Sequence, residues 1–542
     1  GPPQKMGFHR LDQGGQTVSS FLGWYAVPAA GGLTINNAAV TMSAGVTQQI
    51  QPGTAVTING GGSLTLPNYT LGTASVRNVL TQTFGSLTFV NDGGANTPTF
   101  NLGNPGVVAA TVAPLSITEF TSATPITATN DSLSTTPQVI TGNALNTELR
   151  FSAANPVITV NAGLAETGLV IGAVIGQSAT MMSLTKSGPG ILALAGENLF
   201  SADFILNQGG VLVAANFLDN NGEVPDAGPL GSGTLIINGG FLLGDGLARI
   251  VRNPVTVAAH FDFGGNVATN NLTLGGPVAF GNLPRSIGVL SPAVTATISG
   301  PITYTQSSGY ALTKTGPGVL VLSGVNSFNG NGVDVAGGVL RVASVCAIPF
   351  ATPIQVAAGA GLDLNGVDLT LVRITGGGFV TNSSAGQSIL TVGGAAPFTF
   401  SGSFIDNDGF NTNSSLQVTK VGAGMMTLRA ESFNTGGLFV EAGVVELGAG
   451  GLTTRGGQVD ISEDAVFRVN RTDTFELSSI FTGAGDLRQV GTGTTVFTGN
   501  SNLFFGNVFV DAGALHLGDD VQTTGDLGSA TIAVASGTYL GF

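Results

Sequence analysis

The chain has 542 residues and a formal net charge of −14, and only 9% of its residues are charged whereas 42% are hydrophobic. This composition excludes a disordered chain, because so much apolar surface can be buried that chain ordering is offset. The excess of acidic groups opposes nucleic-acid binding, and no apolar run of about 18 residues predicts a membrane-spanning helix.

Local composition predicts strands along the whole chain. Residues that fill exposed helix faces are scarce, with four lysines, whereas there are 84 glycines. Gly, Asn and Asp interrupt short runs of Val, Leu, Ile, Thr and Phe, which is typical of short strands joined by tight turns. We therefore expect an all-β fold.

Residues 1–30 differ from the rest of the chain, because they hold the single tryptophan and lack the rhythm of glycine turns. We interpret them as an N-terminal arm or cap rather than as part of the repetitive region. Four aromatic residues of this arm are candidates for self-assembly: Phe8, Phe21, Trp24 and Tyr25.

Beyond the arm, residues 31–183 alternate strands and turns without a clear repeat, and residues 184–542 contain four recognisable ones. The second copy begins Leu312-Thr-Lys-Thr-Gly-Pro-Gly-Val-Leu-Val-Leu-Ser-Gly324 and closes with Ala336-Gly-Gly-Val-Leu-Arg-Val342. The other copies begin at Leu184, Val418 and Leu487. Each unit has the order strand, glycine turn, strand, polar loop, strand, glycine turn, strand.

These segments resemble the autotransporter-associated β-strand repeat, in which Leu-Thr-Lys-x-Gly-x-Gly precedes an Asn and Phe cluster and a closing Ala-Gly-x-Leu. The fourth copy departs from the pattern at Gln489, where the family has lysine. The resemblance covers roughly residues 184–542. It implies a β-solenoid in the passenger of a bacterial autotransporter, exported to the cell surface or beyond.

The repeat itself also predicts a solenoid. Alternation such as Val319-Leu320-Val321-Leu322 leaves one apolar strand face, which coils of about 20 residues bury by stacking on one another. Parallel strands joined by crossovers are right-handed in about 98% of cases. The expected fold is therefore a right-handed parallel β-helix, or β-solenoid.

Repeat positions are interpreted as structural. We expect each lysine stem to lie along the solenoid with its ammonium in water or on a turn carbonyl, and the glycines to turn the corners at positive φ. Corner asparagines Asn198, Asn326 and Asn434 tolerate the left-handed region and bond to nearby backbone. The repeat-motif residues are Lys186, Gly188, Gly190, Lys314, Gly316, Gly318, Lys420, Gly422, Gly424, Gly491 and Gly493.

Other reactive or ligating residues give weaker signals. Cys346 is interpreted as a small buried hydrophobe in an apolar run. Asp406 and Asp408 place hard oxygen ligands at alternate positions, but no bidentate Glu follows, so an Asx-rich turn is favoured over a weak metal site. We expect no cofactor, no other metal site and no catalytic residues.

We therefore predict a non-catalytic structural or adhesive protein of a bacterial cell surface, with partners that are other copies of itself, surfaces or glycans. The chain ends in strand-like sequence, so Tyr539 and Phe542 join the aromatic arm as candidates for end-to-end assembly into a filament. Two alternatives stay open: an autotransporter passenger that binds a host or glycan, and a polysaccharide lyase or hydrolase on a β-helix, which would need paired carboxylates.

Overall fold

The computed structural model describes residues 32–42, 50–66, 79–91, 97–103, 115–131, 134–142, 147–216, 227–264, 271–306, 309–328, 332–350, 352–406, 413–448, 458–501, 503–518 and 525–542. These residues form strands and turns and contain no helix. The chain divides into two compact units, residues 1–235 and 236–542.

Unit 1 contains three parallel sheets, and each successive coil adds a strand to a sheet. The sheets have the strand orders β1-β3-β6-β9-β12-β15-β17, β2-β4-β7-β10-β13-β16-β18 and β5-β8-β11-β14. The strands are β1 (Leu33–Asn36), β2 (Ala39–Thr41), β3 (Val56–Asn59), β4 (Ser63–Thr65), β5 (Val79–Phe84), β6 (Leu87–Asn91), β7 (Thr99–Asn101), β8 (Leu115–Phe120), β9 (Ile126–Asn130), β10 (Gln138–Thr141), β11 (Thr147–Phe151), β12 (Val157–Val160), β13 (Leu169–Ile171), β14 (Val174–Ile175), β15 (Ser183–Ser187), β16 (Ile191–Leu194), β17 (Asp203–Leu206) and β18 (Gly210–Val213).

Unit 2 is built in the same way. Its longest sheet has the order β20-β23-β26-β29-β31-β33-β36-β39-β42-β44-β46-β49-β51-β53, and shorter parallel sheets close the coils. The strands are β20 (Phe241–Gly244), β21 (Arg249–Val251), β22 (Val255–Val257), β23 (Phe261–Phe263), β24 (Leu272–Leu274), β25 (Val278–Gly281), β26 (Arg285–Val289), β27 (Thr295–Ile298), β28 (Ile302–Tyr304), β29 (Tyr310–Thr315), β30 (Val319–Leu322), β31 (Gly332–Val335), β32 (Val339–Val342), β33 (Pro353–Val356), β34 (Gly361–Asp363), β35 (Leu369–Leu371), β36 (Arg373–Gly376), β37 (Phe379–Thr381), β38 (Gly386–Val392), β39 (Phe398–Phe400), β40 (Ser403–Ile405), β41 (Ser414–Lys420), β42 (Met425–Leu428), β43 (Leu438–Val440), β44 (Val444–Leu447), β45 (Gln458–Ile461), β46 (Val466–Val469), β47 (Thr474–Leu477), β48 (Ile480–Gly483), β49 (Asp486–Gln489), β50 (Thr494–Phe497), β51 (Asn507–Val510), β52 (Ala514–Leu517), β53 (Thr531–Val534) and β54 (Tyr539–Gly541), while β19 (Leu235–Ile237) spans the boundary between the units.

Coil length differs between parts of the chain. In unit 1, Ile126 of β9 pairs with Ile158 of β12, and a third strand, β11, lies in the coil between them. In unit 2, Val319 of β30 pairs with Val339 of β32, and the coil between them is shorter because it carries a single further strand, β31. The expected coil of about 20 residues therefore describes the repeats, whereas the earlier coils are longer.

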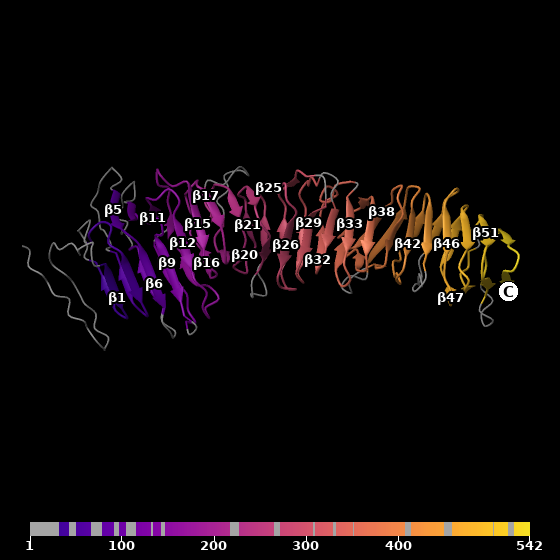
Figure 1. The fold of residues 1–542 in the computed structure, drawn as a ribbon, viewed down its shortest axis with the longest axis horizontal. Coiled ribbons are helices and arrows are strands. Elements are labelled where there is room, and N and C mark those ends of the chain that lie inside the picture. The colour runs from indigo at the N-terminus through magenta and orange to yellow at the C-terminus, as the bar shows by residue number, and fades with distance from the viewer. Residues whose placement is uncertain are drawn as a thin grey trace, which may run out of the picture. The chain divides into compact units, whose positions relative to one another are not determined.

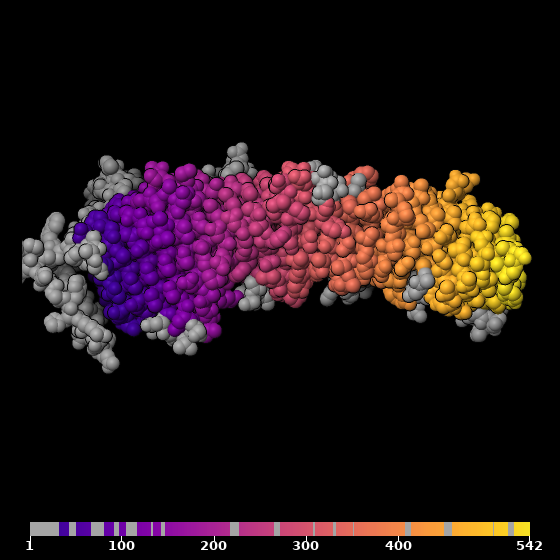
Figure 2. Space-filling model, in the orientation of Figure 1, coloured from indigo at the N-terminus to yellow at the C-terminus, as the bar shows by residue number. Residues whose placement is uncertain are grey.

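The interior of each unit is a continuous apolar stack. In β30, Leu320 and Leu322 are fully buried while Val319 and Val321 are half-buried, as the alternation predicts. Phenylalanines of successive coils meet ring to ring, with Phe84 and Phe120 centroids 5.7 Å apart in unit 1 and Phe467 and Phe481 centroids 5.1 Å apart in unit 2. Figure 1 shows successive strands of unit 2 side by side in chain order, and Figure 2 shows their side chains packed into a surface.

The expected all-β, parallel β-solenoid class is confirmed by these stacked parallel sheets. The boundary at residues 183 and 184, drawn where recognisable repeats begin, remains a proposal. The arm, residues 1–30, lies outside the described part of the chain.

Candidate functional site

Each repeat folds as two stacked coils. In the first copy, β15 and β16 form part of one coil and β17 and β18 part of the next, with Leu184 paired to Phe204 and Leu192 to Val211. The other copies stack in the same way, through β29 to β32, β41 to β44 and β49 to β52. The repeat is thus the smallest unit that contains a coil-to-coil interface.

A lysine in three copies joins the two coils from inside. The Nζ atom of Lys186 donates to the carbonyl oxygens of Ser187 and Gly188 in its own turn, at 2.8 and 2.7 Å, and of Gln208 in the next coil, at 3.0 Å. The two later copies repeat this geometry: Lys314 donates to Thr315, Gly316 and Gly337, and Lys420 donates to Val421, Gly422 and Ala442. The three N–H groups of each ammonium are therefore used.

The lysine ammonium groups bond to turn carbonyls, which was one of the two expected positions, and the side chains are buried rather than in water. Lys186, Lys314 and Lys420 are each 0% exposed. Burial lowers the pKa of Lys186 to about 7 and of Lys314 to about 8, and it also lowers the pKa of Lys420. The carbonyl cage opposes this effect, because a neutral amine has only two N–H donors for three acceptors.

Positive φ was expected of both glycines of each turn, but it occurs only at the first glycine of the three lysine copies and at neither glycine of the fourth. Gly188, Gly316 and Gly422 adopt φ of 78°, 73° and 73°, where a side chain would be strained. The second glycine is required for close approach, since a Cβ on Gly318 would lie 2.3 Å from the Ser291 carbonyl oxygen of the preceding coil. Gly190, Gly424, Gly491 and Gly493 make similarly close approaches, at 2.5, 2.5, 2.1 and 2.1 Å to backbone oxygens of preceding coils.

A second set of polar bridges comes from Asn326 and its counterparts, which bond to backbone as expected, and the backbone belongs to the neighbouring coils. Asn326 accepts at Oδ1 from the backbone N–H of Ile302 in the coil before, and donates from Nδ2 to the carbonyl of Ala347 in the coil after, both at 2.7 Å. Asn198 makes equivalent bonds to Ile175 and Pro229. Ser432 and Ser501 occupy the same repeat position and accept the first bond, from Phe404 and Phe481.

Asn198 and Asn326 are bridges rather than left-handed corners, whereas Asn434, two residues beyond the bridge position, donates from Nδ2 to the carbonyls of Leu416 and Gly437. Among the described residues, positive φ outside glycine occurs at Asn37, Asn365 and Asp464, and not at Asn198, Asn326 or Asn434. The bridge position lies just after the turn that closes the first half of the repeat. That fixed offset, shared by the four copies, was the signal in the sequence.

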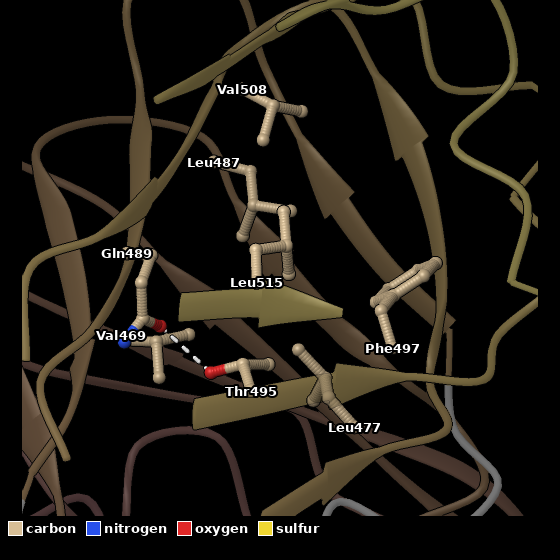
Figure 3. Close-up of a pocket in the computed structure, with 8 residues that line it drawn as sticks. All are labelled: Val469, Leu477, Leu487, Gln489, Thr495, Phe497, Val508 and Leu515. Carbon is tan, nitrogen blue, oxygen red and sulfur yellow. Dashed lines mark hydrogen bonds between the residues drawn. The ribbon is translucent and has the colours of Figure 1, made fainter. Parts of the chain in front are cut away.

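The fourth copy lacks the lysine bridge. Gln489 donates from Nε2 to Gly491 and Gly493 of its own turn and accepts at Oε1 from the Thr495 hydroxyl, at 2.7 Å, as Figure 3 shows. Within the described residues, no bond from this side chain reaches the turn of the next coil at Ala512. A small interior cavity of about 10 Å³, roughly one water molecule in size, lies beside Gln489 and Thr495, with apolar lining from Leu487 and other residues shown in Figure 3.

The self-assembly candidates are only partly within the described residues. Phe8, Phe21, Trp24 and Tyr25 lie outside them. Tyr539, on β54, is 60% exposed and stacks against His516, with ring centroids 6.3 Å apart, and Phe542 is 82% exposed. Two of the six candidate aromatic side chains, Tyr539 and Phe542, are therefore described, and both lie on the surface of unit 2.

The weak metal candidate has a backbone function. Asp406 accepts hydrogen bonds from the N–H groups of Leu416, at 3.0 Å, and Thr435, at 2.8 Å, so it joins neighbouring segments at a corner. Asp408 lies outside the described residues. Within the described ranges, no three His, Cys, Asp or Glu side chains are grouped as metal ligands.

Cys346 is exposed, so the expectation of a small buried hydrophobe was wrong. It sits in the turn after β32, where its backbone N–H donates to the Ser344 hydroxyl at 3.2 Å. Val345 beside it is 66% exposed, and the buried residues of the segment are Ala347 and Ile348. An apolar run crossing a turn cannot bury every side chain, because the turn faces solvent.

The comparisons with known proteins match this architecture. A family model described as Passenger-associated-transport-repeat matches residues 184–214, 312–342, 418–447 and 487–517, which are the four two-coil units. The adhesin BmaC autotransporter of Brucella suis biovar 1 (strain 1330) is 27% identical over 538 aligned residues. The alignment covers 91% of this chain but 14% of that much longer protein. No solved structure matches the chain.

Within the described residues, no helix is long and apolar enough to cross a membrane. The stacked parallel coils and the four matched segments both indicate a repeat β-solenoid. The chain is a parallel β-solenoid that carries four passenger-associated transport repeats and is similar to part of an autotransporter adhesin, which indicates a protein secreted to the cell surface.

Proposed function

We propose that this chain is an adhesive, non-catalytic passenger segment that holds a binding surface away from the bacterial cell. The observation that supports this most is the similarity to an adhesin along 91% of the chain, carried on a fold whose repeats are built as structural stacks. Because the chain spans 14% of that adhesin, its own partners are a matter for experiment.

The polar interior fits a structural role. Buried lysines, asparagines and serines of the repeats bond to backbone, and several carboxylates are neutralised within the solenoid. Asp363 is paired with Arg341 at 2.6 Å, and Glu446 is bound by Arg468. Such pairing supports a scaffold over the lyase or hydrolase alternative, which needs carboxylates free to act on a sugar bond.

Adhesion is tested with beads coated with the purified chain and applied to mammalian epithelial cells and to extracellular matrix. Beads should attach in greater number than beads coated with an unrelated β-solenoid of similar charge, and soluble chain should compete. Attachment equal to that control on every surface would contradict the proposal. Release of reducing or unsaturated ends from polysaccharides would instead revive the enzyme alternative.

A finer proposal concerns assembly. In the described residues, Tyr539 is 60% exposed and Phe542 is 82% exposed. We propose that copies of the chain associate through these exposed aromatic side chains and the aromatic residues of the N-terminal arm.

Sedimentation velocity tests this assembly. The wild-type chain should form larger species as its concentration rises, whereas a variant with Trp24→Ser and Tyr25→Ser should stay monomeric. A sedimentation coefficient independent of concentration for the wild type would contradict the assembly proposal and leave the adhesive one standing.

A further inference from the structure

The outward face of unit 2 carries a continuous line of hydrogen-bonding side chains. Ser286, Thr313, Asp334, Gln355 and Thr375 pair in register from β26 to β36, so one polar side chain is contributed by each of five neighbouring strands. We call these residues the polar row. With strands about 4.8 Å apart, the row is roughly 19 Å long.

The polar row points to solvent. Its members are half-buried, whereas the residues on either side of Asp334 and Gln355 in their strands, such as Val333 and Ile354, are buried in the core. Strands β26, β29 and β33 follow one another in chain order in Figure 1, with β31 between β29 and β33 in the sheet. The row therefore runs across the strands on the outside of unit 2.

Asp334 differs from other strand carboxylates of unit 2. Asp363 is held by Arg341, and Asp460 accepts from the Thr482 hydroxyl at 2.7 Å. Among the described residues, Asp334 has no hydrogen-bonding partner for its Oδ1 atom, which is shielded from solvent. Partial burial raises the pKa of this carboxyl group. A buried acceptor left unpaired is costly, and a rotation of the side chain that turns this oxygen outward would let a ligand hydroxyl donate to it.

An aromatic ring is fixed beside this carboxylate. Tyr310 of β29 lies across Gly332 of β31, where a Cβ atom would be 2.6 Å from the ring. Its hydroxyl donates to Oε1 of Gln355 on β33, at 2.8 Å, which leaves the Gln355 amide N–H groups available. Tyr310 is nevertheless 37% exposed, so its ring is held in place and remains accessible.

We infer that the polar row with Tyr310 binds an oligosaccharide chain of neutral hexose units laid across the strands. A pyranose ring has an apolar face that packs on an aromatic ring and hydroxyls at its edge that both donate and accept. Tyr310 supplies the aromatic surface, Asp334 the acceptor, and Gln355 and the threonine hydroxyls both functions. The net charge of −14 disfavours acidic glycans. This inference rests on the proposed adhesive function and names its ligand class.

The test is binding of the whole chain to an array of neutral, N-acetylated, sulfated and sialylated oligosaccharides of four or more units, followed by titration of the best ligand. We expect neutral members to bind. Asp334→Asn and Tyr310→Ala should each weaken binding by about tenfold, and Tyr310→Phe, which keeps the ring, by about threefold. Asp460→Asn, which removes a carboxylate on a different sheet, should leave binding unchanged, and circular dichroism should show all variants folded.

Binding to no member of the array, binding to acidic members alone, or undiminished binding by Asp334→Asn and Tyr310→Ala would overturn the inference. Beads that attach to cells while the array stays empty would reject the polar row as the site and leave adhesion standing. Array binding that depends on Asp334, with no attachment to cells or matrix, would reject the adhesive function and leave the site standing.

Discussion

The three lysine copies and the glutamine copy of the repeat differ in how the side chain at this position bonds to the carbonyl groups of the turns. Lys314 reaches three carbonyls, one of them across the coil interface at Gly337, whereas Gln489 spends its bonds within one turn and on Thr495. The longer, charged side chain connects neighbouring coils. The shorter one satisfies its own turn and lies beside a cavity of about 10 Å³.

The difference also involves a neighbour. Leu192, Leu320 and Met426 stand at the same repeat position after the lysines as Thr495 does after Gln489. The threonine hydroxyl is only satisfied because Gln489 accepts its hydrogen bond. Lysine is therefore paired with an apolar residue and glutamine with threonine. Combining lysine with threonine should be unfavourable, because the buried hydroxyl would lose its acceptor.

The largest expected effect is from Lys314→Met, which removes the charge and leaves Gly337 and the turn carbonyls without their donor. Local stability of β29 and β31 should fall by about 3 kcal/mol. Amide hydrogen exchange measures this strand by strand, and protection of Ala336, whose N–H bonds the Lys314 carbonyl, should drop. Gln489→Met is the matched control in the fourth copy, and its effect should be smaller and confined to its own turn.

A smaller loss is expected from Asn326→Ala, which removes one bond to each neighbouring coil and should cost about 2 kcal/mol. Ser501→Ala should cost about 1 kcal/mol, because among the described residues the serine side chain bonds to the coil before and not to the coil after. Hydrogen exchange at Ile302 and Phe481 reports the two losses. Equal losses for the two variants would show that the second asparagine bond contributes nothing.

Converting the fourth copy to the lysine type should stabilise it. Gln489→Lys together with Thr495→Leu fills the cavity and supplies a donor for Ala512, for a gain of about 1 kcal/mol. Gln489→Lys alone should be less stable than the double variant, because the Thr495 hydroxyl loses its acceptor. A double-mutant cycle followed by hydrogen exchange of β50 and β52 gives the coupling between the two positions.

The smallest effect is expected with pH. Since burial lowers the pKa of Lys186 from its ordinary value of 10.5 to about 7, the unfolded chain holds a proton in this window that the folded chain releases. Stability of the wild type relative to Lys186→Met should thus rise with pH across this window and stay flat below it. The rise should be small, because the carbonyl cage retains the ammonium. Urea midpoints of both proteins at pH 6, 8 and 9.5 give the slope, and a falling difference would show a raised pKa.

The sequence was sufficient for the fold because its signals are local. Glycine turns and alternating strands recur at fixed spacing within each copy, and each copy carries the complete two-coil unit, so Lys314, Gly316 and Gly318 could be assigned to a corner without coordinates. Whether a side chain faces the core also depends on where a turn starts, and for this reason Cys346 was wrongly expected to be buried.

What the sequence could not provide is the register between coils. Ser286, Thr313 and Asp334 are separated by unequal stretches of chain, and no constant spacing marks them as neighbours. No constant spacing marks the two coils that Asn326 contacts either, although the position of Asn326 within the repeat could be identified from the sequence. Because coil length differs from one part of the chain to another, such rows can be identified only once the strand pairing is known.

The most direct test of the buried bridges is the exchange of lysine ammonium protons with water, followed by NMR on the chain labelled with ¹⁵N-lysine. Three of the four lysines should give slowly exchanging Nζ signals at pH 6, and each of Lys186→Met, Lys314→Met and Lys420→Met should remove one of them. Fast exchange at all four, as for lysines in water, would contradict an interior held together by ammonium bridges between coils.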